Sequence, residues 1–360
     1  MIAKNKKELF TILKEYMEID GISRYEDDVV KKLKSRTANN GFEYQRGGMG
    51  SLIMRKKGNG PKILIMAHMD EVGYVVKDIL DNGQLRVFCV GGIWPSVVIG
   101  TKATLISGNG KKYQGIFGHT SIHILGAVKA KEAMKTEDMF VDFGFKNKKE
   151  AEELNIEPGN RIYMSAESFI MHNEDLVVGK AMDNRAGVTA LDQIAQHVSN
   201  MKIDADIYLV GSVQEEVGSR GAKNVVSLIK PDVAFALDTC PSHDTHGAKK
   251  GIQKLGKGAA LTMADSGTMM DPKLIDFIFK LGKEKNIPVY KYVAQGGGTD
   301  AEQIQYAQGG VATSCISIPQ RYLHSPHGMA SLTDIQASID LLVEFIKNFT
   351  TEELNKITYK

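Results

Sequence analysis

The sequence lacks an excess of charge of either sign and has few cysteines. Its 45 Lys and Arg residues nearly balance its 43 Asp and Glu residues, giving a formal net charge of +2. Proteins that follow nucleic-acid phosphates usually show a basic excess gathered on one face, so this balance argues against nucleic acid as a partner. The three cysteines, Cys89, Cys240 and Cys315, are odd in number and far apart. They form no disulfide framework and favour a reducing compartment.

Long apolar segments are also missing. No run approaches the roughly 20 residues of a membrane-spanning helix, and neither end carries a lipidation motif. The N-terminal segment lacks the apolar stretch of a secretory signal, and Leu9, Leu13 and Met17 recur there at helical spacing, which predicts a packing helix. We therefore expect a cytoplasmic protein that does not enter a membrane.

The patterns along the chain divide it into two kinds of region. At about 150 residues per domain, 360 residues fit two domains or one large domain with an insertion. Residues 71–167 hold short β-prone runs separated by Gly, Asn and Asp, with helical periodicity only near 127–135 and 148–154. We predict a small β-rich domain there, inserted into an α/β domain formed by residues 1–70 and 168–360.

Apolar and helical segments alternate in the second half of the chain, which predicts a mostly parallel sheet covered by helices. The expected strands are residues 51–54, 62–67, 205–212, 232–238, 287–293 and 311–318. The expected helices are residues 5–19, 26–40, 185–199, 218–230, 271–284 and 332–349.

Acidic residues and histidines recur where the predicted strands end. Because ligands of an open parallel sheet bind outside the carboxyl ends of its strands, these segments are expected to meet in one crevice. The segments are Ala67–Glu71 (AHMDE), Ala181–Arg185 (AMDNR), Gln214–Gly218 (QEEVG), Leu237–Thr239 (LDT) and Arg321–Pro326 (RYLHSP).

Each segment taken alone has a structural alternative. His68 with Asp70 could form a carboxylate–imidazole–metal chain, or His68 could cap a turn. The adjacent carboxylates of Glu215 and Glu216 are costly to bury unless cations offset them, yet acidic residues also favour the first turn of a helix. Asp183 could likewise be a helix N-cap.

Taken together, the segments predict a metal centre. Two histidines and three carboxylates at the strand ends of one sheet match the donors that bind a pair of divalent cations such as zinc, cobalt or manganese. A bridging aspartate with two further ligands per metal leaves room for a shared water, whose pKa such a centre lowers toward ~7.

In this order and spacing, the motifs AHMDEVG, AMDNRAG, QEEVGSRGA, ALDT, GGGTDA and RYLHSP closely resemble the glutamyl and TET (tetrahedral) aminopeptidase family. Its members are cytoplasmic dimetal peptidases, among them FrvX-like proteins and some named endoglucanases. The resemblance covers the whole chain. It implies a zinc-peptidase-like α/β fold with an inserted barrel-like domain that mediates oligomerisation, from dimers up to a hollow tetrahedral dodecamer.

The resemblance also implies the roles of individual residues. Asp183 would bridge both metals, with His68 and Asp238 completing one site, Glu216 and His324 completing the other, Glu215 as the general base, and Asp70 holding His68. The chain departs from the family at two places. Asn184 stands where members commonly have a second Asp, and residues 119–123 read HTSIH where Pro-Pro-His is usual. The second departure puts in doubt any rim role for His123.

Other candidate residues have simpler interpretations. His119 and His123 lack the Glu of a zincin helix, so rim or structural roles are expected. His243 and His246 are expected in a solvated loop. Gly296–Gly298 is no phosphate loop, since no Gly-Lys-Ser/Thr follows, and instead brings backbone close to substrate. Cys240 is not expected to be a ligand, because the metal site is complete without it.

The function predicted is that of a dinuclear metal-dependent aminopeptidase acting on peptides with a free N-terminus. A metal-bridging hydroxide would attack the scissile carbonyl, and Glu215 would carry the proton to the leaving amine. The alternatives are a metal-dependent deacylase of N-acyl amino acids, a glycosidase, and a non-catalytic peptide-binding assembly. Glycosidases usually use a pair of metal-free carboxylates, so the dense ligand set argues against sugar chemistry. The preferred N-terminal side chain is not set by the sequence.

Overall fold

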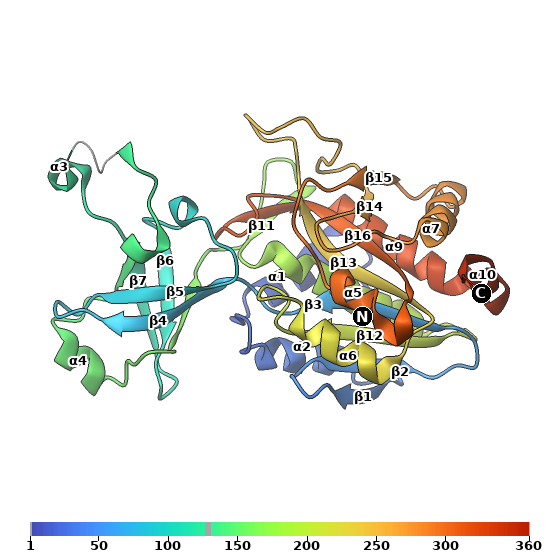
Figure 1. The fold of residues 1–360 in the computed structure, drawn as a ribbon, viewed down its shortest axis with the longest axis horizontal. Helices are drawn as coiled ribbons and strands as arrows, with labels where there is room; N and C mark the ends of the chain where they lie inside the picture. Colours follow the sequence, from blue (N-terminus) through green and yellow to red (C-terminus); the bar gives the residue numbers. More distant parts are fainter. Residues whose placement is uncertain (1, 127–130, 360) are drawn as a thin grey trace.

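Figure 1 shows the computed structural model of the protein, which describes residues 2–126 and 131–359. The chain forms a large α/β body, to which both termini belong, and a smaller β body formed by the middle of the sequence. None of the helices in the described residues combines the length and apolar character needed to cross a membrane.

One mixed sheet forms the centre of the α/β body. In spatial order its strands are β1 (Glu43–Arg46), β2 (Leu52–Lys56), β12 (Asp206–Ser212), β3 (Lys62–His68), β13 (Val233–Pro241), β16 (Ala312–Arg321), β17 (Gly328–Ser331), β11 (Leu176–Gly179) and β10 (Phe169–Ile170). Two more strands, β14 (Ala259–Ala264) and β15 (Val289–Val293), extend from β16. The sheet is parallel from β12 through β3 and β13 to β16, and antiparallel at β1, β2, β10, β11 and β17.

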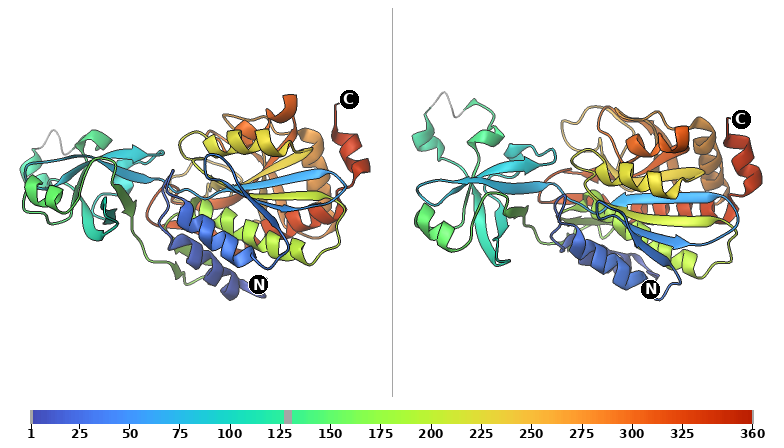
Figure 2. Two further views of the ribbon diagram at one scale, coloured as in Figure 1. Left: turned by 90° about the horizontal axis from the view of Figure 1, so that it is seen from below. Right: turned by 60° about the horizontal axis from the view of Figure 1, so that its bottom comes forward.

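The parallel strands are apolar runs because both faces of the sheet are covered. In β3 and β12 nearly every residue is buried, as expected for a parallel sheet between two helical layers. On one face lie α5 (Met182–Ser199) and α9 (Leu332–Asn348), with α1 (Lys6–Met17) and α2 (Asp27–Thr37) packed on α5. On the other face lie α6 (Arg220–Ile229) and α8 (Ala301–Ile304) (Figure 2).

The remaining helices lie at the margin of the sheet. Helix α7 (Pro272–Glu284) packs on α9 and on β14 and β15, and α10 (Thr351–Ile357) packs on α7. The 3-10 turn η4 spans Ala307–Gly309. The sequence determines where α7 begins. Asp271 accepts the N–H of Leu274, and Pro272 occupies the first helical turn.

The smaller body is a closed antiparallel barrel. Its strands close in the order β4 (Gly73–Ile79), β5 (Leu85–Val90), β8 (Phe140–Asp142), β7 (Lys112–Gly118), β6 (Lys102–Ile106) and β9 (Arg161–Met164). Its connections carry η1 (Pro95–Val97), α3 (Ile122–Leu125), η3 (Thr136–Asp138) and α4 (Lys148–Glu153). Inward residues such as Tyr74, Leu105 and Phe117 form a core separate from that of the α/β body.

The predicted fold class, an α/β body with an inserted β-rich barrel, is confirmed. The helix expected at residues 148–154 corresponds to α4, whereas residues 131–135 form no α-helix. Residues 127–130 of the other expected helix lie outside the described part of the chain. The barrel strands begin at Gly73 and end at Met164, while domain boundaries at residues 71 and 167 stay a prediction.

Candidate active site

The predicted metal ligands lie at one edge of the large sheet. His68 is the last residue of β3, and Asp238 lies in β13, which runs parallel to β3 beside it. Parallel strands end at the same edge, so segments distant in sequence converge there. The other predicted site residues follow strands at this edge: Asp183 follows β11, Glu215 and Glu216 follow β12, and His324 follows β16.

The ligand atoms form two groups that share Asp183. One carboxylate oxygen, Oδ1, lies 3.1 Å from His68 Nε2, and the other, Oδ2, lies 3.3 Å from His324 Nε2. His68 Nε2 is also 3.4 Å from Asp238 Oδ1, and His324 Nε2 is 3.4 Å from Glu216 Oε2. Within each group the ligand atoms lie within 4.8 Å of one another. This arrangement fits a bridging carboxylate between two cations.

Both imidazoles are oriented by hydrogen bonds from their Nδ1 atoms. His68 Nδ1 lies 3.1 Å from the carbonyl oxygen of Asp70, and His324 Nδ1 lies 2.6 Å from that of Gly92. A carbonyl only accepts, so Nδ1–H donates in both cases and leaves Nε2 free to bind a metal. Gly92 belongs to the barrel region, which therefore reaches into the site.

The clustered carboxylates and imidazoles of this site favour bound cations. Burial lowers the pKa of both imidazoles, but the surrounding carboxylates outweigh it and raise the pKa of His324 to about 11 and that of His68 well above its ordinary value. Burial and Asp183 raise the pKa of Glu216 to about 7 against the effect of His324. Burial opposes ionisation of Asp183, yet hydrogen bonds with His324 and His68 hold its pKa below the usual range. Divalent cations can replace the protons that these groups otherwise share.

Asp70 connects His68 to the Glu215–Glu216 turn. Its Oδ1 accepts the N–H of Glu215 at 3.0 Å and lies 3.4 Å from His68 Nδ1. Its Oδ2 accepts the N–H of Glu216 at 3.2 Å and the hydroxyl of Ser23 at 2.6 Å. Although burial raises the pKa of Asp70, His68 and these hydrogen bonds lower it below the ordinary value. His68 Nδ1 lies closer to the backbone carbonyl of Asp70, at 3.1 Å, than to this carboxylate, so the role of the carboxylate in holding His68 stays a prediction. The two contacts with backbone N–H groups were not anticipated.

Glu215 lies beside the ligands but belongs to neither ligand group. Its Oε2 is 3.9 Å from His68 Nε2. Burial raises the pKa of Glu215 well above its ordinary value against the opposing effect of His68, and the neighbouring carboxylates of Asp238 and Glu216 raise it further. A carboxylate with a raised pKa next to a metal centre has the properties of a proton acceptor and donor.

Comparison with known proteins identifies the family. Residues 50–341 match the family model described as M42 glutamyl aminopeptidase. The chain belongs to this family. It is 32% identical to the glutamyl aminopeptidase of Lactococcus lactis, over 97% of this chain and 99% of that protein. It is also 32% identical to the lysyl aminopeptidase of Pyrococcus furiosus, over 92% of this chain and 94% of that protein. The M42 chain is therefore a peptidase.

Solved structures agree with this family. The TET aminopeptidase of a marine sediment Thaumarchaeota archaeon superposes with a TM-score of 0.94 at 31% identity, covering 99% of this chain and 100% of that one. The TET1 peptidase of Pyrococcus horikoshii, described as assembling into a tetrahedron or a large octahedral shell, gives a TM-score of 0.84 at 27% identity. That comparison covers 95% of this chain and 100% of the other.

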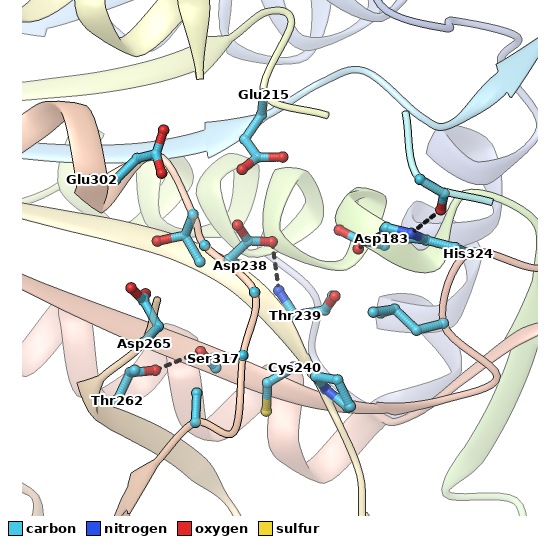
Figure 3. A pocket seen from close by; sticks show the side chains of 18 of the residues that line it. Asp183, Glu215, Asp238, Thr239, Cys240, Thr262, Asp265, Glu302, Ser317 and His324 are labelled. Carbon is cyan, nitrogen blue, oxygen red and sulfur yellow. Dashed lines mark hydrogen bonds and ion pairs between the residues drawn. The ribbon is translucent and has the colours of Figure 1, made fainter. Parts of the chain in front are cut away.

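A cavity of about 590 Å³ opens beside the ligands of this M42 peptidase. Asp183, Glu215 and His324 line it toward the metal groups, and Asp265 and Glu302 line it at the other side (Figure 3). Sequence reasoning missed Asp265 and Glu302, since neither ends a predicted strand. Gly296–Gly298 also line the cavity, in keeping with a loop close to the substrate.

The other residues considered from the sequence have varied positions. His119 and His123 are exposed in the barrel region, and His246 is exposed in its loop. His243 lines the cavity, so the expectation of a solvated loop describes it incompletely. Cys240 is buried against the cavity and is not among the two ligand groups.

Asn184, at the position where the family commonly has a second Asp, connects α5 to β13. Its amide donates to the carbonyl of Leu237 at 2.8 Å, and its side-chain oxygen accepts the N–H of Gly187 at 2.9 Å. These bonds fix the start of α5 beside the sheet edge without using Asp183.

Proposed function

We propose that this M42 peptidase is a dinuclear metal-dependent aminopeptidase with Asp183 as the bridging ligand and Glu215 as the general base. The observation that carries the proposal is the position of Asp183, whose two carboxylate oxygens each face the free Nε2 of a different histidine. His68 and Asp238 would complete one metal site, and Glu216 and His324 the other. The donor set of imidazole and carboxylate suits zinc, cobalt or manganese.

Two divalent cations held in this way would lower the pKa of a shared water and polarise the scissile carbonyl. Glu215 would accept the proton of that water and return it to the leaving amine, a role typically worth about 10²–10⁴-fold in rate. Asp70 would keep the catalytic turn in place, because it holds His68 and the backbone of Glu215 and Glu216.

Peptides with a free N-terminus are the proposed substrates. The two curated relatives are named as aminopeptidases, which supports exopeptidase action here. Carboxylates next to the metal ligands could anchor the substrate's ammonium group and so exclude internal peptide bonds. The cytoplasmic location stays a prediction.

Self-assembly through the barrel domain, residues 71–167, is the second part of the proposal. The barrel region exposes several large apolar side chains: Phe88, Trp94, Ile116, Ile122 and Ile124. Exposed apolar patches on soluble proteins commonly mark interaction surfaces. The TET1 relative is described as assembling into a tetrahedron or a large octahedral shell, and another TET1 structure is described as a dodecamer, which supports self-assembly of this chain from dimers up to a dodecamer. Light scattering of the protein in solution measures the mass of the assembly and so distinguishes a monomer, a dimer and a dodecamer.

The catalytic proposal is tested with metal-free full-length protein titrated separately with Zn²⁺, Co²⁺ and Mn²⁺. Turnover of aminoacyl anilides should require metal and reach its maximum at two ions per chain. N-acetylated anilides should not be cleaved. Cleavage of only the acetylated substrates would identify a deacylase, and peptide binding without any turnover would identify a non-catalytic assembly.

A further inference from the structure

Two carboxylates line the cavity away from the metal ligands. Asp265 follows the last residue of β14, and Glu302 lies in α8. Figure 3 shows them on one side of the cavity, with Asp183 and His324 on the other. Neither belongs to a metal-ligand group, and neither forms an ion pair among the described residues. Their role is not explained by the metal centre.

Backbone N–H groups bind one carboxylate oxygen of Asp265 and leave the other oxygen unpaired. Its Oδ1 accepts the N–H of Gly267 at 2.8 Å and that of Thr268 at 2.7 Å. Its Oδ2 is buried and has no hydrogen-bond partner within the described residues. Leaving a buried carboxylate oxygen unpaired is costly, so a donor from a ligand would remove the penalty.

Glu302 is positioned by glycines of two loops. A Cβ atom at Gly267 would lie 2.7 Å from Glu302 Oε2, and one at Gly298 would lie 3.2 Å from the same atom. A side chain at Gly267 would therefore displace the carboxylate, and one at Gly298 would crowd it. The glycine-rich segment at 296–298 thus provides space for a charged group as well as access to the backbone.

An unpaired polar group elsewhere on the cavity wall also points to a polar ligand. Thr239 is only 8% exposed, lines the same cavity, and has no partner for its hydroxyl in the part of the chain that the structure describes. Buried polar groups are normally hydrogen-bonded, so an unpaired one beside a cavity indicates a missing partner.

The charge of the cavity indicates the sign of that ligand. Its described lining includes no Lys or Arg. Of its three histidines, His68 and His324 belong to the metal groups, and the Nδ1–H of His243 donates to the carbonyl of Lys249 at 2.8 Å. Two divalent cations would offset the carboxylates of the metal groups, whereas no cationic side chain of the described lining offsets Asp265 and Glu302.

We propose that Asp265 and Glu302 form the subsite for the side chain of the substrate's N-terminal residue, and that this residue is lysine or arginine. The inference rests on the proposed aminopeptidase function. Lysine and arginine carry several N–H donors on long side chains, and their bonds to carboxylates are stronger than neutral ones. Relatives of this chain are named for glutamyl and for lysyl substrates, so similarity alone does not decide the preference.

The test compares lysyl, arginyl, leucyl and glutamyl anilides on metal-loaded full-length protein. The wild type should cleave the lysyl and arginyl substrates with the highest kcat/KM. Asp265→Asn and Glu302→Gln should each lower the lysyl-to-leucyl ratio of kcat/KM by about tenfold, the effect of one lost charge-assisted bond. The change should lie mainly in KM.

Glu284→Gln is the matched control, because it removes the same charge from an exposed position on α7 outside the cavity. Its lysyl-to-leucyl ratio should equal that of wild type. Thermal unfolding of all the variants shows whether each is folded. Glu302→Lys should shift the preference toward the glutamyl substrate.

Two results would overturn the subsite. One is a wild-type preference for the glutamyl substrate, and the other is an unchanged lysyl-to-leucyl ratio in both variants. If the ratio is unchanged because both substrates lose equally, the carboxylates belong to the α-ammonium group instead. If no anilide is cleaved, the aminopeptidase proposal fails. Calorimetric binding of lysinamide against leucinamide then decides the subsite by itself, and equal affinities would refute it.

Discussion

Replacing Asp70 by asparagine should reduce activity without changing any metal ligand. The asparagine oxygen can still accept the N–H of Glu215, and its amide can donate to Ser23, but the amide then faces the N–H of Glu216. The variant loses one bond to a carboxylate and the negative charge beside His68. Bonds to charged groups are worth about 1.5–3 kcal/mol, so kcat/KM should fall about 10- to 100-fold.

The assay is kcat/KM on an aminoacyl anilide at saturating metal, together with a calorimetric metal titration that should show weaker binding. Asp192→Asn is the control, because Asp192 is equally buried and accepts the hydroxyl of Tyr16 at 2.9 Å, but lies outside the ligand groups. The control should lose stability and keep wild-type kcat/KM. Wild-type kcat/KM and metal affinity in folded Asp70→Asn would refute the positioning role of Asp70.

Three further predictions concern the metals, the pH dependence and the backbone. Asp183→Asn should lose metal measured by elemental analysis, and two tightly bound ions in that variant would contradict the bridging role. Burial and Asp70 raise the pKa of Glu26 from 4.5 to about 7, so its protonation favours the folded state, and this stabilisation is lost as pH rises through that range. Urea unfolding should show the unfolding free energy of Glu26→Gln rising relative to that of wild type by on the order of 3 kcal/mol between pH 4 and pH 8. Parallel pH profiles of the two unfolding free energies would contradict this. A Cβ atom at Gly58 would lie 2.2 Å from the carbonyl oxygens of Asp204 and Ala205, so Gly58→Ala should cost about 1–3 kcal/mol of unfolding free energy. Gly48→Ala meets nothing closer than 3.9 Å and is its control; equal urea midpoints for the two variants would refute the clash.

Much of the fold could be predicted from local patterns. The apolar run at residues 62–67 becomes β3, and the helical spacing at residues 5–19 becomes α1. Strand direction could not be predicted in the same way, because periodicity is identical in parallel and antiparallel strands. The sequence therefore did not show that β2, expected as a strand at residues 51–54, is antiparallel. The antiparallel strands β1, β10, β11 and β17 were absent from the prediction, as was β14, which joins β16.

The candidate ligands could be selected because polar residues at the ends of apolar strands are unusual in sequence and converge in a parallel sheet. The contacts around them depend on tertiary structure and leave no such signal. The carbonyl of Gly92 that orients His324 comes from a backbone atom in another region. Asp265 and Glu302 are ordinary loop and helix carboxylates in sequence, and only the fold brings them to one cavity.

Glu215→Gln measured for both metal content and turnover tests the central claim most directly. The side chain lies outside both ligand groups, so the variant should bind two divalent ions per chain as wild type does. Its turnover of aminoacyl anilides should fall by about 10²–10⁴-fold, because the proton acceptor is removed. Wild-type turnover in the metal-loaded variant would contradict the account.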